Sequence, residues 1–353
     1  MCGMSHTDKL SMIRDGRISA DEILSGLGIP IQKAMNLSTA RGFDSAVSQL
    51  AGMLRRFAGR SESEALRAAI GGLDVDWHSM KATERSALVN RALANAGRAL
   101  SPVHERIRVP LGRAANEVFR ATRQDSRRRG LSIGADFNAV DRRAVRYVTR
   151  ANCLFVRDEY GRRVEGLGRE AKRIVAQGLE RGLGREDIAQ DLAQAAESSL
   201  VRRASSYWEV VAASFVGESR SLSQISSYAE AGIERYVISA VLDEHTTDTC
   251  RFLDGKVLET GEALRRFERL EASDDPMAIK NERPWVREKV GEDGKTRLFA
   301  GESVLAQVER SGYGARDDRG EFSRGLSGKE LAPLGVGFPP FHGMCRSNVV
   351  PDI

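Results

Sequence analysis

Hydrophobic side chains recur at spacings of three and four residues along most of the first 230 positions, which is the period of amphipathic helices. The clearest case lies within residues 38–59, where one face carries Phe43, Val47, Leu50, Leu54 and Phe57. The same pattern, bounded by glycines, prolines and Ser/Thr/Asp residues, predicts a series of helices. They cover residues 18–28, 38–59, 61–72, 79–100, 110–129, 136–152, 169–199 (helix, glycine turn, helix) and 202–232.

Two of these helices begin with a Ser-x-x-Glu pattern, in which the serine and glutamate side chains bond each other's backbone N–H groups. The pairs are Ser19 with Glu22 and Ser61 with Glu64. Each pair predicts a helix start at its serine. Gly232 predicts the stop of the last long helix.

The pattern changes after Gly232. Residues 233–243 are rich in β-branched side chains and predict a strand, and residues 255–259 predict a short return strand. A helix over 261–273, a hairpin over 283–301 turning at Glu-Asp-Gly, and a polar, glycine-rich loop over 311–330 follow. We therefore expect an α+β fold, in which a long, mainly helical N-terminal region precedes a small C-terminal α+β module. The expected parts are residues 1–165, a second helical part over 166–232, and the module over 233–353.

The composition is that of a globular protein, with 41% hydrophobic and 29% charged residues. No apolar run reaches the roughly 18–20 residues that span a bilayer, and the first residues lack a signal-peptide pattern, so we expect a cytoplasmic protein without a membrane partner. The charge is uneven: 45 of the 54 basic residues are Arg, and residues 101–150 hold 12 Arg against 5 acids. Such a stretch suits phosphate backbones or acidic protein surfaces, although a solvated helix face in an Arg-rich protein has the same composition. The candidate nucleic-acid contacts are Arg127, Arg128, Arg129, Arg142 and Arg143.

Four cysteines are too few and too scattered for a secreted disulfide framework. Cys2 and Cys153 have no ligand-type neighbour in motif spacing, and we expect Cys153 to be a core residue. Cys250 follows the predicted strand, and Cys345 follows His342 in the Pro-initiated stretch near the end of the chain.

The segment after the strand supplies several groups that bind metals or transfer protons: Asp243, His245, Asp248, Cys250 and Asp254. Cysteine and histidine together are the ligands that tetrahedral zinc prefers, and the H-x-x-C pair presents both from one turn. A zinc ion bound between the two segments would attach the tail to the strand, which a small module with little core needs. A disulfide between Cys250 and Cys345, plain packing of both, and a turn-capping role for His245 are the alternatives.

These segments together resemble the phage Mu protein F-like head-morphogenesis family, the minor head proteins of tailed phages. The resemblance lies in "YAEAG", the strand, "DEHTTDTC", "LDGK" and "PPFHGMCR", and it extends over about residues 170–353. The matching positions are Tyr228, Gly232, Asp243, Glu244, Thr246, Cys250, Leu253, Gly255, Lys256, Pro339, Pro340, His342, Cys345 and Arg346.

The chain departs from the family pattern at two positions. Many family members have C-x-x-C before the Gly-Lys segment and a Cys-Arg-Cys ending, whereas this chain has Thr247 and Ser347 there. The resemblance then implies a metal set of Cys250, His342 and Cys345, with His245, Asp243 or water as the fourth ligand. The span between Lys256 and Pro339 is interpreted as an insertion.

The resemblance implies a structural and assembly protein of the virion head, present in the host cytoplasm during assembly, with the portal, other head proteins and packaged DNA as partners. It implies no enzymatic activity and no cofactor other than zinc. The alternatives from other classes are a metal-dependent nuclease or phage-delivered toxin, in which His245, Asp243 and Asp248 would act near the metal, and a host nucleic-acid-binding module based on the Arg-rich stretch.

Overall fold

The computed structural model describes residues 36–202, 204–314 and 318–352, and those from 37 onward belong to one compact unit. The predicted capping pair Ser19–Glu22 and Cys2 lie outside the described residues. The described part is mainly helical and ends in small antiparallel sheets, so the predicted α+β class is confirmed.

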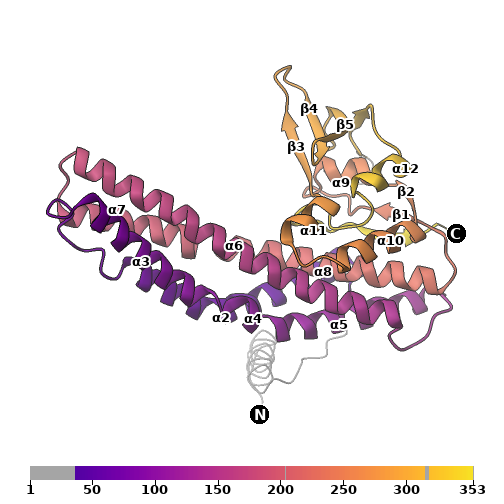
Figure 1. The fold of residues 1–353 in the computed structure, drawn as a ribbon. Coiled ribbons are helices and arrows are strands. Elements are labelled where there is room, and N and C mark those ends of the chain that lie inside the picture. Colours follow the sequence, from indigo (N-terminus) through magenta and orange to yellow (C-terminus); the bar gives the residue numbers. More distant parts are fainter. Residues whose placement is uncertain (1–35, 203, 315–317, 353) are drawn as a thin grey trace, which may run out of the picture. The chain divides into compact units, whose positions relative to one another are not determined.

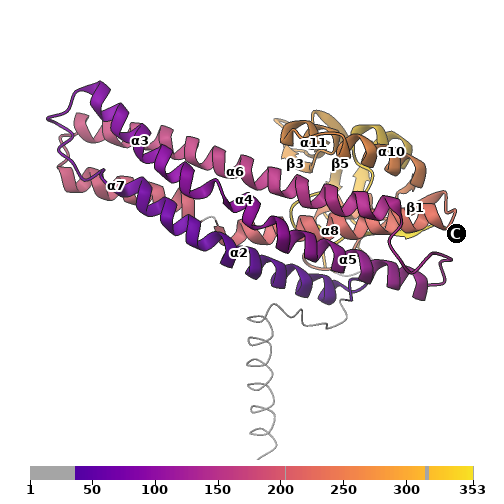
Figure 2. The ribbon, with the colours of Figure 1, turned by 60° about the horizontal axis from the view of Figure 1, so that its bottom comes forward.

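Long helices lie side by side and make up the N-terminal part of the unit (Figures 1 and 2). The central helix α8 contacts both α2 and α5, and α6 packs along α3, α5 and α8. The helices in chain order are α2 (Ala40–Ile70), α3 (Ala82–Leu100), α4 (Val103–Arg106), α5 (Arg108–Arg128), α6 (Ala139–Glu180), α7 (Arg185–Glu197), the π-helix Ser198–Arg202 and α8 (Ala204–Glu230).

Helix α2 is longer than the sequence predicts, because it continues through the expected start at Ser61. Ser61 is buried and accepts a hydrogen bond from Arg106 Nη1 at 2.8 Å, so its hydroxyl serves a tertiary contact rather than a cap. The predicted Ser61–Glu64 capping pair is therefore wrong. On the predicted apolar face, Phe43 through Leu54 are buried, whereas Phe57 is 43% exposed.

Helix α6 likewise joins two predicted helices into one of 42 residues. The expected boundary between residues 165 and 166 falls inside it. The expected boundary at Gly232 coincides with the turn after α8, where Gly232 has the left-handed φ of +74° that favours glycine. Cys153 lies in the core, as the sequence predicts.

The C-terminal module contains two antiparallel sheets, ordered β2-β1-β7 and β3-β4-β5-β6. The predicted return strand is β2, the predicted hairpin is β3 with β4, and both pairings are confirmed. The expected loop over 311–330 contains a short strand and a helical turn. The strands are β1 (Arg235–Ser239), β2 (Val257–Glu259), β3 (Val286–Val290), β4 (Thr296–Ala300), β5 (Ser303–Arg310), β6 (Glu321–Ser323) and β7 (Asn348–Pro351). The module's helices are α9 (Asp248–Leu253), α10 (Thr260–Glu271), α11 (Pro276–Glu282), α12 (Gly328–Leu331) and the 3₁₀ turn Ala332–Leu334.

Polar contacts fix the module to the long helices. The hydroxyl of Tyr228 on α8 donates to the carbonyl of Val349 on β7 at 2.8 Å, and both residues are buried. A second contact connects the module to α6, where Arg143 donates to Glu271 of α10 at 2.7 Å. Figure 1 shows the module lying over this end of α6 and α8.

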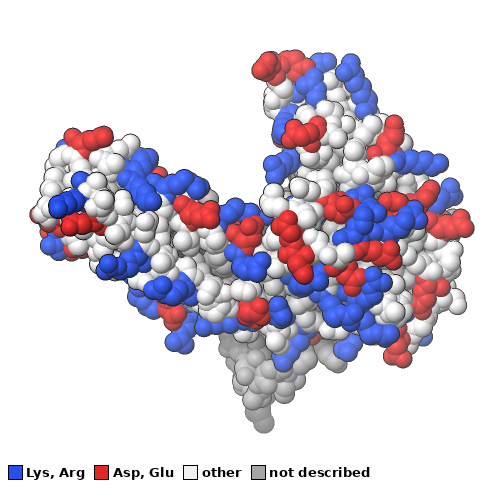
Figure 3. Space-filling model, in the orientation of Figure 1, with Lys and Arg blue, Asp and Glu red and all other residues white. Residues whose placement is uncertain are grey.

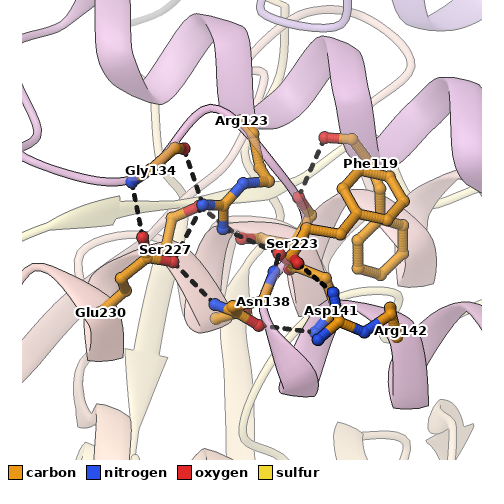
Figure 4. Close-up of polar contacts among 11 residues, drawn as sticks. Phe119, Arg123, Gly134, Asn138, Asp141, Arg142, Ser223, Ser227 and Glu230 are labelled. Carbon is orange, nitrogen blue, oxygen red and sulfur yellow. Dashed lines mark hydrogen bonds and ion pairs between the residues drawn. The ribbon is translucent and has the colours of Figure 1, made fainter.

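A buried ion network holds the connection between α5 and α6 against the end of α8 (Figure 4). Arg123 donates to Asp141 at 2.8 Å and to Glu230 at 2.9 Å, and Glu230 also accepts the backbone N–H of Gly134 at 2.6 Å. Asn138 caps α6 and donates to Glu230 at 2.7 Å. Because each charged group has hydrogen-bond partners of opposite charge, the network fixes the end of α5 in the fold.

Candidate metal centre

The pairing of the first and last strands brings the two predicted ligand segments together. In the antiparallel pair β1–β7, Ser239 lies opposite Asn348, so residues that follow β1 meet residues that precede β7. Cys250 lies on α9, which begins after its cap Thr247, and its partners His342 and Cys345 lie in the turns before β7. The meeting is a direct consequence of the strand order.

Cys250, His342 and Cys345 form one cluster, with all three ligand atoms within 4.8 Å of one another. The Cys250 and Cys345 sulfurs lie 3.7 Å apart, and His342 Nε2 is 3.0 Å from the Cys250 sulfur. Tetrahedral zinc, with bonds of about 2.3 Å to sulfur and about 2.0 Å to nitrogen, places two sulfurs about 3.8 Å apart and sulfur and nitrogen about 3.5 Å apart. The sulfur–sulfur distance fits this geometry directly, and the imidazole has to move by about half an ångström to match it.

Both sulfurs are buried, and their protonation is unequal. Burial raises the pKa of Cys345, but hydrogen bonds from Cys250 and His342 outweigh it and hold that pKa well below the usual thiol range. The hydrogen bond to Cys345, together with burial, raises the pKa of Cys250. Cys345 is therefore the sulfur that ionises more readily, and zinc, which binds the thiolate rather than the thiol, would also have to displace the proton of Cys250.

Two hydroxyl groups complete the surroundings. Thr247 Oγ1 lies 3.3 Å from His342 Nε2 and also accepts the backbone N–H of Cys250, at 3.4 Å, as the cap of α9. Ser347 is 1% exposed, and its side chain interacts with the Cys250 thiol and lowers the pKa of that group. A buried hydroxyl and a capping hydroxyl thus adjoin the three ligands.

His245 does not join the cluster, so its predicted role as a metal ligand is wrong. Its side chain is largely exposed, and its ring lies 3.6 Å from the carboxylate of Glu244. Its backbone N–H donates to Asp243 Oδ1 at 3.0 Å in a tight turn, and this turn directs the imidazole into solvent. The alternative role, a residue of the turn, describes it correctly.

The three aspartates of this segment have structural partners instead. Asp243 accepts a hydrogen bond from Arg346; although burial raises its pKa, that bond and neighbouring donors bring the pKa below its usual value. Asp248 accepts from Ser311 at 2.6 Å, and Asp254 accepts the backbone N–H of Ala240 at 2.9 Å. Each carboxylate therefore fixes a loop around the cluster rather than facing into it.

Sequence reasoning missed Arg220, a fully buried cation of α8 next to the cluster. Its guanidinium donates to the carbonyls of Arg346 at 2.9 Å, Ser347 at 2.6 Å and Leu37 at 3.1 Å. Burial lowers its pKa to about 10, and the charge of Cys345 opposes that shift. Its only signal in the sequence is an arginine among the small and apolar residues of a long helix.

The five predicted nucleic-acid contacts divide into two groups. Arg127 and Arg128 are exposed near the end of α5, and Arg142 donates to the carbonyl of Phe137. Arg129 pairs with Asp125, one helical turn earlier in the chain, at 2.8 Å, and Arg143 pairs with Glu271 of α10. Both arginine side chains remain partly exposed, so contact with nucleic acid stays a prediction for all five residues.

In the described part of the chain, no helix combines the length and apolar character needed to cross a membrane.

No protein-family model, no curated protein and no solved structure matches the chain. The family resemblance stays a prediction from the motifs, and the proposals that follow depend on the chain's own geometry.

Proposed function

We propose that this chain is a structural and assembly protein of a tailed-phage head, a minor head protein that acts with the portal and other head proteins during head assembly and DNA packaging or delivery. The observation that carries the proposal is the convergence of Cys250 with His342 and Cys345, which lie about a hundred positions further along the chain. The sequence segments that resemble the head-morphogenesis family are those that build this cluster. The protein would occur in the virion head and, during assembly, in the host cytoplasm.

The cluster suits a structural zinc ion. Cys250, Cys345 and His342 would hold it, and the ion would cross-link the segment after β1 to the segment before β7. An oxygen ligand is required at the fourth position, because the described residues bring no further thiol or imidazole within reach. Thr247 and Ser347 border that position.

The surroundings of the cluster favour a structural role over a hydrolytic one. Both thiols are buried, and Asp243, Asp248 and Asp254 are held by loop contacts rather than aimed at the cluster. A metal-dependent nuclease needs a general base within hydrogen-bond reach of metal-bound water. We therefore propose no catalytic activity.

The ligand substitutions H342A and C345A test the proposal. We expect both to release the metal and to reduce incorporation of the protein into purified heads, whereas the matched control C153A removes a buried thiol far from the cluster and leaves both unchanged. Metal is measured by elemental analysis of purified protein, and incorporation by quantitative mass spectrometry of particles. Incorporation of H342A and C345A at the level of C153A would contradict the role of the cluster in assembly. Metal-dependent nicking of supercoiled DNA that is lost in H342A would replace the structural role with the nuclease alternative.

A further inference from the structure

The arginines of residues 101–150 fall into two groups. In one group the side chain bonds to another residue of the fold, and in the other, called free here, the side chain is exposed without such a bond. Six of the twelve are engaged by side-chain or carboxylate partners: Arg106, Arg108, Arg123, Arg129, Arg143 and Arg150. Arg142 donates to a backbone carbonyl. The side chains of the other five make no hydrogen bond or ion pair to another described residue: Arg113, Arg120, Arg127, Arg128 and Arg146.

Three of the free arginines form a line along α5. Arg113, Arg120 and Arg127 recur every seven residues, which is two helical turns, so they lie on one face of the helix. All three are exposed. At about 1.5 Å of rise per residue, the line extends over about 21 Å with a charge about every 10.5 Å.

The neighbouring helix adds charge at the edge of this line. Thr149 of α6 lies against Gly112 of α5, where an added Cβ would be 3.9 Å from the threonine. Arg146 is exposed and lies three residues before Thr149, on the adjoining side of α6. It therefore lies close to the contact between the two helices.

One carboxylate interrupts the line. Glu117 lies between Arg113 and Arg120 on α5, and its charge interacts with both. The other acid of α5, Asp125, pairs with Arg129. Figure 3 shows basic and acidic side chains interspersed over the face in view.

We infer that the α5 line of Arg113, Arg120 and Arg127 binds the phosphate backbone of duplex DNA without reading its sequence. A rigid row of evenly spaced guanidinium groups matches a regular polyanion, because each group contacts phosphate independently. An apolar protein surface fits this line less well, because the arginines are interspersed with polar residues such as Asn116 and Gln124, although Val109, one turn before Arg113, is 61% exposed. The inference extends the proposed function by assigning its DNA-facing surface, and it rests on that function for the choice of DNA.

The test uses the purified full chain and a fluorescein-labelled 20-base-pair duplex of arbitrary sequence, with anisotropy measured from 50 to 300 mM KCl. For the triple variant R113Q/R120Q/R127Q we expect the slope of log Kd against log salt to fall by about 2.7, because each phosphate that an arginine no longer neutralises lowers the slope by about 0.9. At 100 mM salt we expect the triple variant to bind the duplex roughly 10²-fold more weakly than the wild-type protein does.

The matched control is R56Q/R67Q/R91Q, which removes the same charge from three exposed arginines of α2 and α3. We expect its slope to remain that of the wild-type protein. The variant E117Q should tighten binding, a gain that loss of folding cannot imitate. Equal weakening of the two triple variants, or an unchanged E117Q, would overturn the inference. Tighter binding to polyglutamate or single-stranded RNA than to the duplex would also overturn it.

The same variants separate this inference from the proposed function. If R113Q/R120Q/R127Q binds DNA as tightly as the wild-type protein but H342A is excluded from heads, the α5 line fails and the assembly function stands. If DNA binding depends on the α5 line but the wild-type protein does not occur in heads, the assembly function fails and the α5 line stands.

Discussion

Arg220 donates from Nη2 to the carbonyl oxygen of Ser347 at 2.6 Å, which connects the centre of α8 to the residue that adjoins the cysteine cluster. The same nitrogen donates to the Arg346 carbonyl, and Nη1 reaches Leu37 at the start of the described unit. A buried guanidinium without a carboxylate partner is tolerated because backbone carbonyls accept hydrogen bonds from both of its terminal nitrogens, although Nε has no hydrogen-bond partner among the described residues. Arg220 thus connects both ends of the compact unit to one helix.

We predict that R220M destabilises the protein by about 3 kcal/mol, because removing the donor leaves several buried carbonyl groups unpaired. The free energy of unfolding is measured by urea titration. R220K keeps the charge with a single ammonium group and should lose less. If R220M and R220K unfold at the wild-type urea concentration, the carbonyl contacts contribute nothing to stability.

Removal of the metal should loosen the tail selectively. If zinc joins Cys250 to His342 and Cys345, chelation lowers the melting temperature by about 5 °C or more, because a ligand that binds only the folded state adds to its stability. Hydrogen exchange should then increase first in β7 and in residues 339–347. The control C345A should melt at the same temperature with and without chelator. An identical melting curve for the wild-type protein before and after chelation would contradict a stabilising metal.

Thr247 offers a direct way to complete the ligand set. Its side chain adjoins the imidazole of His342, so T247C places a third sulfur at the cluster. We expect zinc affinity to rise roughly 10- to 100-fold, the range over which changes around a metal site act. The substitution also removes the cap of α9, which costs about 1 kcal/mol.

The control for this variant is T247V, which removes the same cap without adding a ligand. Affinity is measured by competition with a chromogenic chelator. A T247C protein that binds zinc no more tightly than T247V would show that residue 247 does not face the metal.

Residue types singled out Cys250, His342 and Cys345 in the sequence, the family resemblance grouped them, and the structure brings the three side chains together. Sequence reasoning failed at His245, where a local turn contact with Asp243 decides the direction of the side chain. Residue type alone cannot distinguish a ligand from a turn residue. No sequence motif marks Arg220, because its partners are backbone carbonyls, which every residue has.

In the helices, too, some features follow from the local sequence, whereas others depend on contacts between residues far apart in the chain. Apolar spacing predicted the buried face of α2 up to Leu54, but the apparent cap at Ser61 was overridden by its contact with Arg106, 45 residues away. The Arg-rich stretch was visible in the composition. Which arginines stay free depends on partners such as Glu271, which lies in another part of the fold.

The last prediction concerns Glu62, a carboxylate of α2 buried between α6 and α8. It accepts hydrogen bonds from Tyr160 at 2.6 Å and from Trp208 at 3.4 Å. Burial raises the pKa of Glu62 above its ordinary value of 4.5, although these two donors and the charge of Arg163 oppose the shift. The folded state therefore binds this proton more tightly than the unfolded state does.

The sign of the pH dependence follows from that difference. As the pH rises from 4.5 through the raised pKa, Glu62 must ionise in a buried site, so its contribution to stability falls and then stays constant. The variant E62Q keeps an acceptor for Tyr160 without ionising. We expect urea midpoints from pH 4 to pH 7 to shift progressively in favour of E62Q over the wild-type protein. The control E64Q changes the charge two positions along the same helix, and its curve of urea midpoint against pH should be parallel to that of the wild-type protein. A parallel curve for E62Q as well would show that Glu62 does not cause the pH dependence.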